Sequence, residues 1–110
     1  RRMNAVQWSP HAESLLEDIV LGIAEKLYPD DGLRWEAKLR EAAEELSRFP
    51  LSGVGVPPEC FDTIPPNASN LRQTFCLPYR IVYEVVESEV HVLSIRHSRM
   101  LVTDTDTFWN

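Results

Sequence analysis

The sequence has little cysteine and no long apolar run, and each shortage excludes a class of protein. Its only cysteines, Cys60 and Cys76, are too few for a disulfide-rich secreted fold, and their spacing matches no zinc or redox motif. We expect both to be free thiols in a reducing cytosol. No apolar stretch approaches the roughly 20 residues that a membrane-spanning helix needs. No basic leader followed by an apolar segment opens the chain, so we predict no export signal and a cytoplasmic protein without a membrane partner.

Metal ligands and phosphate loops are also missing from the sequence. The three histidines, His11, His91 and His97, form no ligand pair with one another or with the cysteines at helical or loop spacing. The glycines at 53 and 55 are not followed by the helix that a phosphate-binding loop requires. We therefore predict no metal and no cofactor.

Lysine is scarce, and the formal net charge is −6. The two lysines, Lys26 and Lys38, both fall in the N-terminal half. Proteins that live on nucleic acid usually carry a broadly basic surface. Any basic patch in the C-terminal half must therefore be local and built from arginine.

The N-terminal half carries the periodicity of two helices. Ser9 and Pro10 suit the N-cap and first position of a helix, and a stripe at i, i+3, i+4 and i+7 runs on from Ala12 to Leu27. The segment 28–32 contains Pro29 and Gly32 and interrupts the pattern. Its two acids, Asp30 and Asp31, can cap a second helix, which is predicted over residues 33–48. The short connection predicts an antiparallel helical hairpin.

Strand patterns flank this hairpin. A short strand is predicted at residues 4–8, and three more at 71–77, 79–86 and 90–95, after a proline-rich irregular segment at 50–68. We predict one α+β domain over residues 1–110, with the helical hairpin on one face of a mainly antiparallel sheet that ends in a three-strand meander. Residues 1–3 are interpreted as a remnant of the start or of expression, and residues 101–110 as a tail.

Ordered motifs along the chain resemble the RelE/ParE toxin superfamily. They are Val6-Gln7-Trp8-Ser9-Pro10-His11-Ala12, Leu46-Ser47-Arg48-Phe49-Pro50 with Gly53, Leu71-Arg72, Tyr79-Arg80-Ile81-Val82-Tyr83, and Val92 to Arg99. The resemblance covers roughly residues 5–100. It implies a toxin of a type II toxin–antitoxin (plasmid stabilisation) pair that a cognate antitoxin neutralises. Within the superfamily, RelE-like members cut mRNA on the translating ribosome, whereas ParE-like members poison DNA gyrase.

A metal-independent mRNA interferase needs a base, an acid and several cations at one place. The candidates here are Arg72, Arg80, His97 and Arg99. A two-residue turn at Glu87-Ser88 would place Arg80 near His97, whereas a three-residue turn would place it on the face of Arg96. The alternative is that Arg72 and Arg80 are sheet arginines that pair with Glu84 or with antitoxin carboxylates.

The end of the chain departs from the nuclease pattern. Beyond Arg99 there is no lysine, arginine, histidine or tyrosine, and Asp104 and Asp106 would repel RNA phosphate. We therefore favour a ParE-like toxin acting on gyrase and lean away from an enzyme. The alternatives are a RelE-like ribosome-dependent endoribonuclease and a non-toxic antitoxin-binding module.

The antitoxin is the main predicted partner. Its contacts are expected around the last strands and the helical hairpin, at Arg96, Val102, Phe108 and Trp109, the last three taken as exposed apolar side chains. The two aromatic residues of the tail could equally fold back as a lid or form a contact in a homodimer. The sequence leaves these alternatives open.

Overall fold

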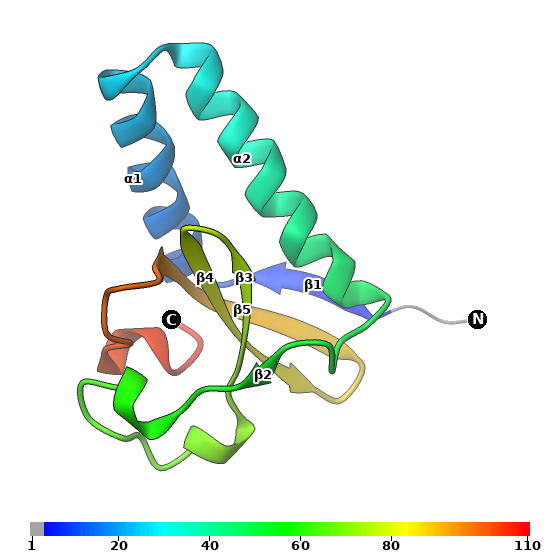
Figure 1. Cartoon of the computed structure of the whole chain (residues 1–110). Coiled ribbons are helices and arrows are strands. Elements are labelled where there is room, and N and C mark those ends of the chain that lie inside the picture. Colours follow the sequence, from blue (N-terminus) through cyan, green and yellow to red (C-terminus); the bar gives the residue numbers. More distant parts are fainter. Residues whose placement is uncertain (1–3) are drawn as a thin grey trace.

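The computed structural model describes residues 4–110 and has an α+β architecture, as predicted (Figure 1). The prediction for residues 1–3 lies outside the described residues. The helices and strands are β1 (Ala5–Trp8), α1 (Pro10–Lys26), α2 (Pro29–Glu44), β2 (Val54–Gly55), β3 (Arg72–Cys76), β4 (Tyr79–Val86) and β5 (Glu89–His97). Short 3-10 helices occupy residues 45–47, 58–60, 68–70 and 104–106. No helix among residues 4–110 combines the length and apolarity that crossing a bilayer requires.

The five strands form one sheet in the order β1-β5-β4-β3-β2. The predicted meander is confirmed, since β3 pairs antiparallel with β4 and β4 antiparallel with β5. The N-terminal strand adds a parallel pairing, Ala5 opposite Glu89 through Trp8 opposite Val92. The connection from β1 to β5 runs through the helical hairpin and then through β2, β3 and β4, so it is long enough for the crossover that parallel neighbours require. Strand β2, which lies in the segment predicted to be irregular, pairs antiparallel with β3.

The turn between β4 and β5 has two residues, Glu87 and Ser88, but it does not give the register expected from that length. Val86 faces Glu89 and Tyr83 faces Val92, whereas Val82 faces Ser94, so Leu93 is an extra residue in a β-bulge. Beyond the bulge Arg80 therefore lies opposite Arg96, and Tyr79 opposite His97. The expected proximity of Arg80 and His97 is wrong, because the bulge moves the pairing by one residue.

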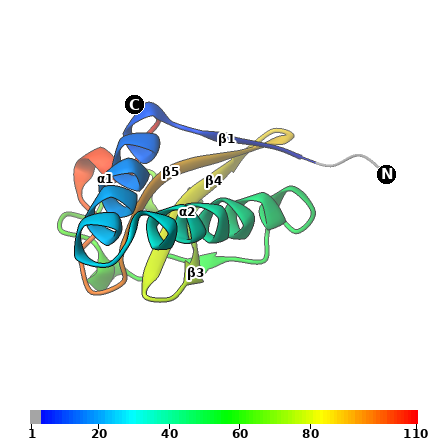
Figure 2. The same cartoon turned by 90° about the horizontal axis from the view of Figure 1, so that it is seen from above.

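Both helices lie on one side of the sheet, which we call the helix face (Figures 1 and 2). The Ser9 hydroxyl caps α1 as predicted, accepting a hydrogen bond from the Ala12 amide at 3.0 Å. The core on this face combines Leu16 and Leu39 from the helices with Ile81, Val92 and Ile95 from the strands. In Figure 2 α2 crosses over β4. The apolar stripes read from the sequence thus face the sheet.

Helix α2 begins at Pro29, four residues before the predicted start. Asp31 caps the helix as expected, since its carboxylate accepts a hydrogen bond from the Tyr28 amide at 3.1 Å, but it does so from within the first helical turn. Gly32 is buried where the helices approach, and a Cβ there would lie 2.8 Å from the Val20 carbonyl oxygen. The proline and the glycine that suggested a break therefore belong to the start of the helix.

The opposite side of the sheet, the back face, carries a second core. Val82 and Leu93 point into it and pack with Val56, Phe61, Leu71 and Val102. The tail is tied to the preceding loop, since the Val102 amide donates to the Cys60 carbonyl at 2.8 Å and the Asp62 amide donates to the Val102 carbonyl at 2.9 Å. Val102 is only 1% exposed, so the expectation that it is a surface side chain is wrong. Cys60 packs at this core and Cys76 at the helix-face core, and both are free thiols.

Two glycines on the helical hairpin should respond in opposite ways to alanine. At Gly22 a Cβ would meet no atom within 4 Å, so we expect Gly22→Ala to raise the free energy of unfolding by about 0.5–1 kcal/mol through better helix propensity. Gly32→Ala should lower it by about 1–3 kcal/mol, because the new methyl group would push the helices apart. Urea unfolding of the two variants beside the unaltered chain measures both changes, and equal signs would contradict this packing.

Candidate functional site

Arg80, a candidate catalytic residue only if the chain is a nuclease, is buried on the back face. It is 6% exposed. Its Nη1 donates to Gln73 Oε1 at 3.2 Å, and its Nη2 donates to the Ser98 carbonyl oxygen. Its Nε has no partner among the described residues. A substrate could reach this guanidinium only by displacing the segments that cover the back face.

Arg72 also donates to acceptors of the protein itself. Its Nη1 lies 2.7 Å from the Gly53 carbonyl oxygen and 3.3 Å from that of Leu51. Arg72 lies on β3 opposite Tyr83 of β4, which is fully buried. The Tyr83 hydroxyl donates a hydrogen bond to the Pro50 carbonyl at 2.8 Å and accepts one from the Gly53 amide at 2.9 Å. Burial raises the pKa of the Tyr83 hydroxyl, although the Gly53 amide and Arg72 oppose the shift. Arg72 and Tyr83 thus fasten the segment around β2 to the sheet.

Arg96, predicted to contact the antitoxin, is held by a carboxylate of the tail. Its Nε donates to Asp106 Oδ2 at 2.7 Å, and the other oxygen of Asp106 lies 2.8 Å from His11 Nε2 at the start of α1. Asp106 is 0% exposed and also accepts from the Thr103 amide at 2.9 Å. Burial alone would raise the pKa of Asp106, but the hydrogen bonds from Arg96, Thr103 and His11 outweigh it and lower the pKa.

The sequence reading missed this Asp106 node, which joins β5, α1 and the tail. Asp106 was interpreted as a charge that would repel RNA, not as a buried acceptor. The available signal was the Thr103-x-x-Asp106 spacing, which is typical of a capping box. No local pattern could add His11, because its contact spans 95 residues of sequence.

His97 and Arg99 remain at the accessible end of β5. His97 lies on the helix face opposite Tyr79, with their ring centroids 6.2 Å apart, and the Tyr79 ring meets Trp35 at 5.6 Å. The Arg99 amide donates to His97 Nδ1 at 3.1 Å, so that ring nitrogen is an acceptor here. The Arg99 side chain is exposed. Burial raises the pKa of Tyr79, so its hydroxyl stays protonated at neutral pH.

The predicted catalytic residues are therefore not gathered into one site. Arg80 is buried on the back face, Arg72 binds the carbonyls before β2, and His97 lies with Tyr79 on the helix face. Catalysis of RNA cleavage needs an acid, a base and cations around one phosphate. In the described residues, the candidate acid, base and cations do not lie around one common point where a phosphate could bind.

The remaining predicted partner contacts lie in the tail. Phe108 is 50% and Trp109 is 43% exposed. The Trp109 ring lies 5.0 Å from the ring of His91 on β5, so the tail folds back onto the sheet while leaving aromatic surface accessible. Their role in binding a partner stays a prediction.

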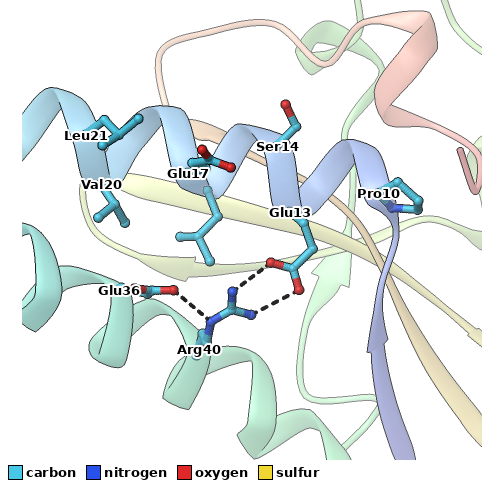
Figure 3. Close-up of a pocket in the computed structure, with 9 residues that line it drawn as sticks. Pro10, Glu13, Ser14, Glu17, Val20, Leu21, Glu36 and Arg40 are labelled. Atoms are coloured by element: carbon cyan, nitrogen blue, oxygen red, sulfur yellow. Dashed lines mark hydrogen bonds and ion pairs between the residues drawn. The ribbon is translucent and has the colours of Figure 1, made fainter.

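A groove runs along the helical hairpin between α1 and α2, and we call it the outer groove (Figure 3). Leu16, Val20 and Leu21 supply its apolar part, and Arg40 reaches into it. The Arg40 guanidinium donates to both oxygens of Glu13, at 2.7 and 3.3 Å, and to Glu36 at 3.3 Å. The hydrogen bonds from Arg40 to Glu13 are the main reason that the pKa of Arg40 is raised. Arg40 thus braces the two helices, while the groove keeps an excess of carboxylates, since Glu13, Glu17 and Glu36 all line it.

No candidate metal-binding site is present in the part of the chain that the structure describes. No group of three or more histidine, cysteine, aspartate or glutamate side chains within residues 4–110 is placed to hold an ion.

Comparison with known proteins agrees with the fold. A family model described as the ParE toxin of the type II toxin–antitoxin system parDE matches residues 6–102. A chain from the chromosomal ParDE toxin–antitoxin system of P. aeruginosa superposes with a TM-score of 0.67 at 18% identity, covering 86% of this chain and 96% of that one. A chain from the RelBE2 toxin–antitoxin complex of Mycobacterium tuberculosis gives 0.57 at 24% identity, with 86% and 98% covered. No curated protein matches the sequence.

Proposed function

The chain belongs to the ParE toxin family of type II toxin–antitoxin systems, and from this premise we propose that it poisons DNA gyrase and that a cognate antitoxin neutralises it. The family accounts for the toxin and its antitoxin partner. The choice of gyrase over messenger RNA rests on this chain's own residues.

The observation that carries the choice is the engagement of the arginines. Arg72, Arg80 and Arg96 each donate to acceptors of the protein itself. A guanidinium already bonded to carbonyl or carboxylate oxygens would have to exchange those bonds before it could stabilise a phosphate. This supports a toxin that acts by binding a protein, for which such a cationic centre is unnecessary.

The surface around Arg80 and Arg96 supports the same proposal. The 3-10 helix at residues 104–106 supplies the buried Asp106, and the loop before β3 fills the rest of the back face with apolar side chains. An RNA strand would meet covering segments there, and the charge of Arg96 is already neutralised by Asp106.

A RelE-like activity is the second candidate, and the observation in its favour is the cluster at the end of β5. His97, Tyr79 and the exposed Arg99 lie close together on or beside the helix face. In that case His97 would be the acid or base and Arg99 the cation of a metal-independent mRNA interferase.

Two assays of the purified chain separate these functions. We expect it to inhibit supercoiling of relaxed plasmid by gyrase and to leave message intact in a reconstituted translation reaction mapped by primer extension. Adding the protein encoded by the neighbouring gene should restore supercoiling. His97→Ala and Arg99→Ala should act on gyrase as the unaltered chain does.

Each opposite result has a definite meaning. Cuts at ribosomal A-site codons that disappear in His97→Ala or Arg99→Ala would make the chain an interferase. An intact message together with unaffected gyrase, at excess toxin, would leave a non-toxic antitoxin-binding module.

A further inference from the structure

A hollow of about 500 Å³ lies where β4 runs on past the start of β3, and we call it the strand-end hollow. Strand β4 extends to Val86, but its pairing with β3 stops at Tyr83, which lies opposite Arg72. The chain before β3 turns into the short helix at residues 68–70 instead of following β4 (Figure 1). Within the described residues, the end of β4 therefore has a strand neighbour on the β5 side alone, and the hollow occupies the other side.

One guanidinium lines the strand-end hollow, and the fold holds it in place without using all of its donors. Arg72 donates to the carbonyls of Gly53 and Leu51 through Nη1 alone. Its Nε and Nη2 are not used in these bonds, and together they form the planar fork that matches a carboxylate. The Ser69 hydroxyl and the Asn70 side-chain amide also line the hollow and add donors to it. This part of the hollow suits a carboxylate.

Two carboxylates line the same hollow, those of Glu84 at the end of β4 and Glu87 in the turn that follows. Neither forms an ion pair within residues 4–110, although Arg72 lines the hollow with them. Glu84 lies opposite His91 on β5, but the His91 ring is bonded to Glu89 instead. The strand-end hollow thus holds one cation and two carboxylates that remain available to a ligand.

These charges indicate the class of ligand. The two carboxylates would repel a nucleic-acid backbone but attract ammonium or guanidinium groups. A complementary small molecule carries one carboxylate and two cationic groups, which describes a basic α-amino acid such as lysine or arginine. The side chains of Leu51, Val85 and Val86 supply apolar surface along which its methylene groups can lie. The volume is also within the range of small-molecule sites.

We propose that the strand-end hollow binds a free basic α-amino acid. Its carboxylate meets Nε and Nη2 of Arg72, and its two cationic groups meet Glu84 and Glu87. The ligand also steadies the segment before β2, because Arg72 holds that segment through Nη1. This binding is separate from the proposed toxin function, so the gyrase and translation assays do not test it.

The first test compares ligands that each lack one charged group. We expect L-lysine and L-arginine to bind with a Kd of roughly 1 mM, as suits a small ligand in an open site. They should shift the backbone amide NMR signals of residues 69–72 and 84–87, in a titration matched with sodium chloride of the same ionic strength. Cadaverine lacks the carboxylate, norleucine lacks the side-chain ammonium, and Nα-acetyl-lysine lacks the α-ammonium. Each of these three should bind at least fivefold more weakly than L-lysine.

The second test removes one charge from the hollow. Glu84→Gln keeps the size of the side chain and should weaken the binding of L-lysine at least fivefold. The matched control is Glu41→Gln, which changes an exposed glutamate on α2 and should alter the Kd by less than about twofold. Thermal unfolding checks that both variants remain folded.

The contrary outcomes are equally definite. Shifts confined to other residues, or no shift beyond that of the salt control at ten times the expected Kd, would overturn the site. Cadaverine that binds as well as L-lysine would overturn the role of Arg72 and leave only attraction of cations to the two glutamates. Nα-acetyl-lysine that binds as well as L-lysine would overturn the free amino acid and assign the hollow to the C-terminal residue of a peptide. Binding that Glu84→Gln leaves unchanged would place the ligand elsewhere.

Discussion

Replacing Asp106 with alanine is expected to lower the free energy of unfolding by about 3–5 kcal/mol, because it removes one partner from a buried ion pair. The Arg96 side chain is only 18% exposed and would lose the carboxylate that neutralises it. His11 and the Thr103 amide would lose the same acceptor. Urea unfolding followed by circular dichroism measures the change.

The control for this replacement is Asp104→Ala, two residues away in the same short helix. Asp104 is exposed, so its loss should cost less than about 0.5 kcal/mol. A loss in Asp106→Ala as small as that in Asp104→Ala would show that the buried contacts of Asp106 do not stabilise the fold.

The same carboxylate should make stability depend on pH in a defined direction. The pKa of Asp106 is lower in the folded chain than in the unfolded chain, so its contribution is complete above the ordinary aspartate value of about 4. The contribution is lost as the pH falls through the lowered value of the folded state. The difference in unfolding free energy between the unaltered chain and Asp106→Asn should therefore be constant near neutral pH and shrink in acid. A difference that grows in acid would contradict the lowered pKa.

Removing the hydroxyl of Tyr83 should produce the second large effect, a loss of about 2–4 kcal/mol. The hydroxyl donates to the Pro50 carbonyl and accepts from the Gly53 amide, and Gly53 is itself buried. Tyr83→Phe keeps the ring in the core but leaves two backbone groups without a partner, and each unpaired buried group costs about 1–3 kcal/mol. Denaturant unfolding gives the total.

Tyr79→Phe on the same strand provides the matched control. The Tyr79 hydroxyl makes no hydrogen bond within the described residues, so this variant should differ from the unaltered chain by less than about 0.5 kcal/mol. Tyr83→Phe should also speed proteolysis near residues 50–55, because the segment before β3 loses its attachment. Unchanged cleavage there would show that Arg72 alone holds the segment.

The helical hairpin could be predicted because its signals are local. Ser9, Pro10 and the apolar stripe specified α1, and the resemblance to the toxin superfamily agreed with the family model later found. The start of α2 was placed too late, because Pro29 and Gly32 resemble loop residues and the close approach of Gly32 to Val20 of α1 is not visible in the local sequence. Local helix propensity cannot show that a glycine within a helix is required for close packing against a second helix.

The register between β4 and β5 and the hydrogen-bond partners of the arginines could not be predicted, for a different reason. Strand β5 is buried on both faces, so its apolar run has no alternation that would reveal the bulge at Leu93. The pairing of Arg96 with Asp106 depends on a tail that folds back over the sheet. Contacts of this kind follow from the complete fold and leave no periodic pattern in the sequence.

The parallel pairing of β1 with β5 bears on the order in which the protein is made. The first strand finds its neighbour only after residues 89–97 exist, and the start of α1 finds Asp106 later still. A chain growing from its N-terminus can form the helical hairpin early, but it must wait for its last segment to close the sheet. During synthesis the nascent chain thus passes through a stage in which the helical hairpin has formed while the sheet still lacks the pairing of its first and last strands.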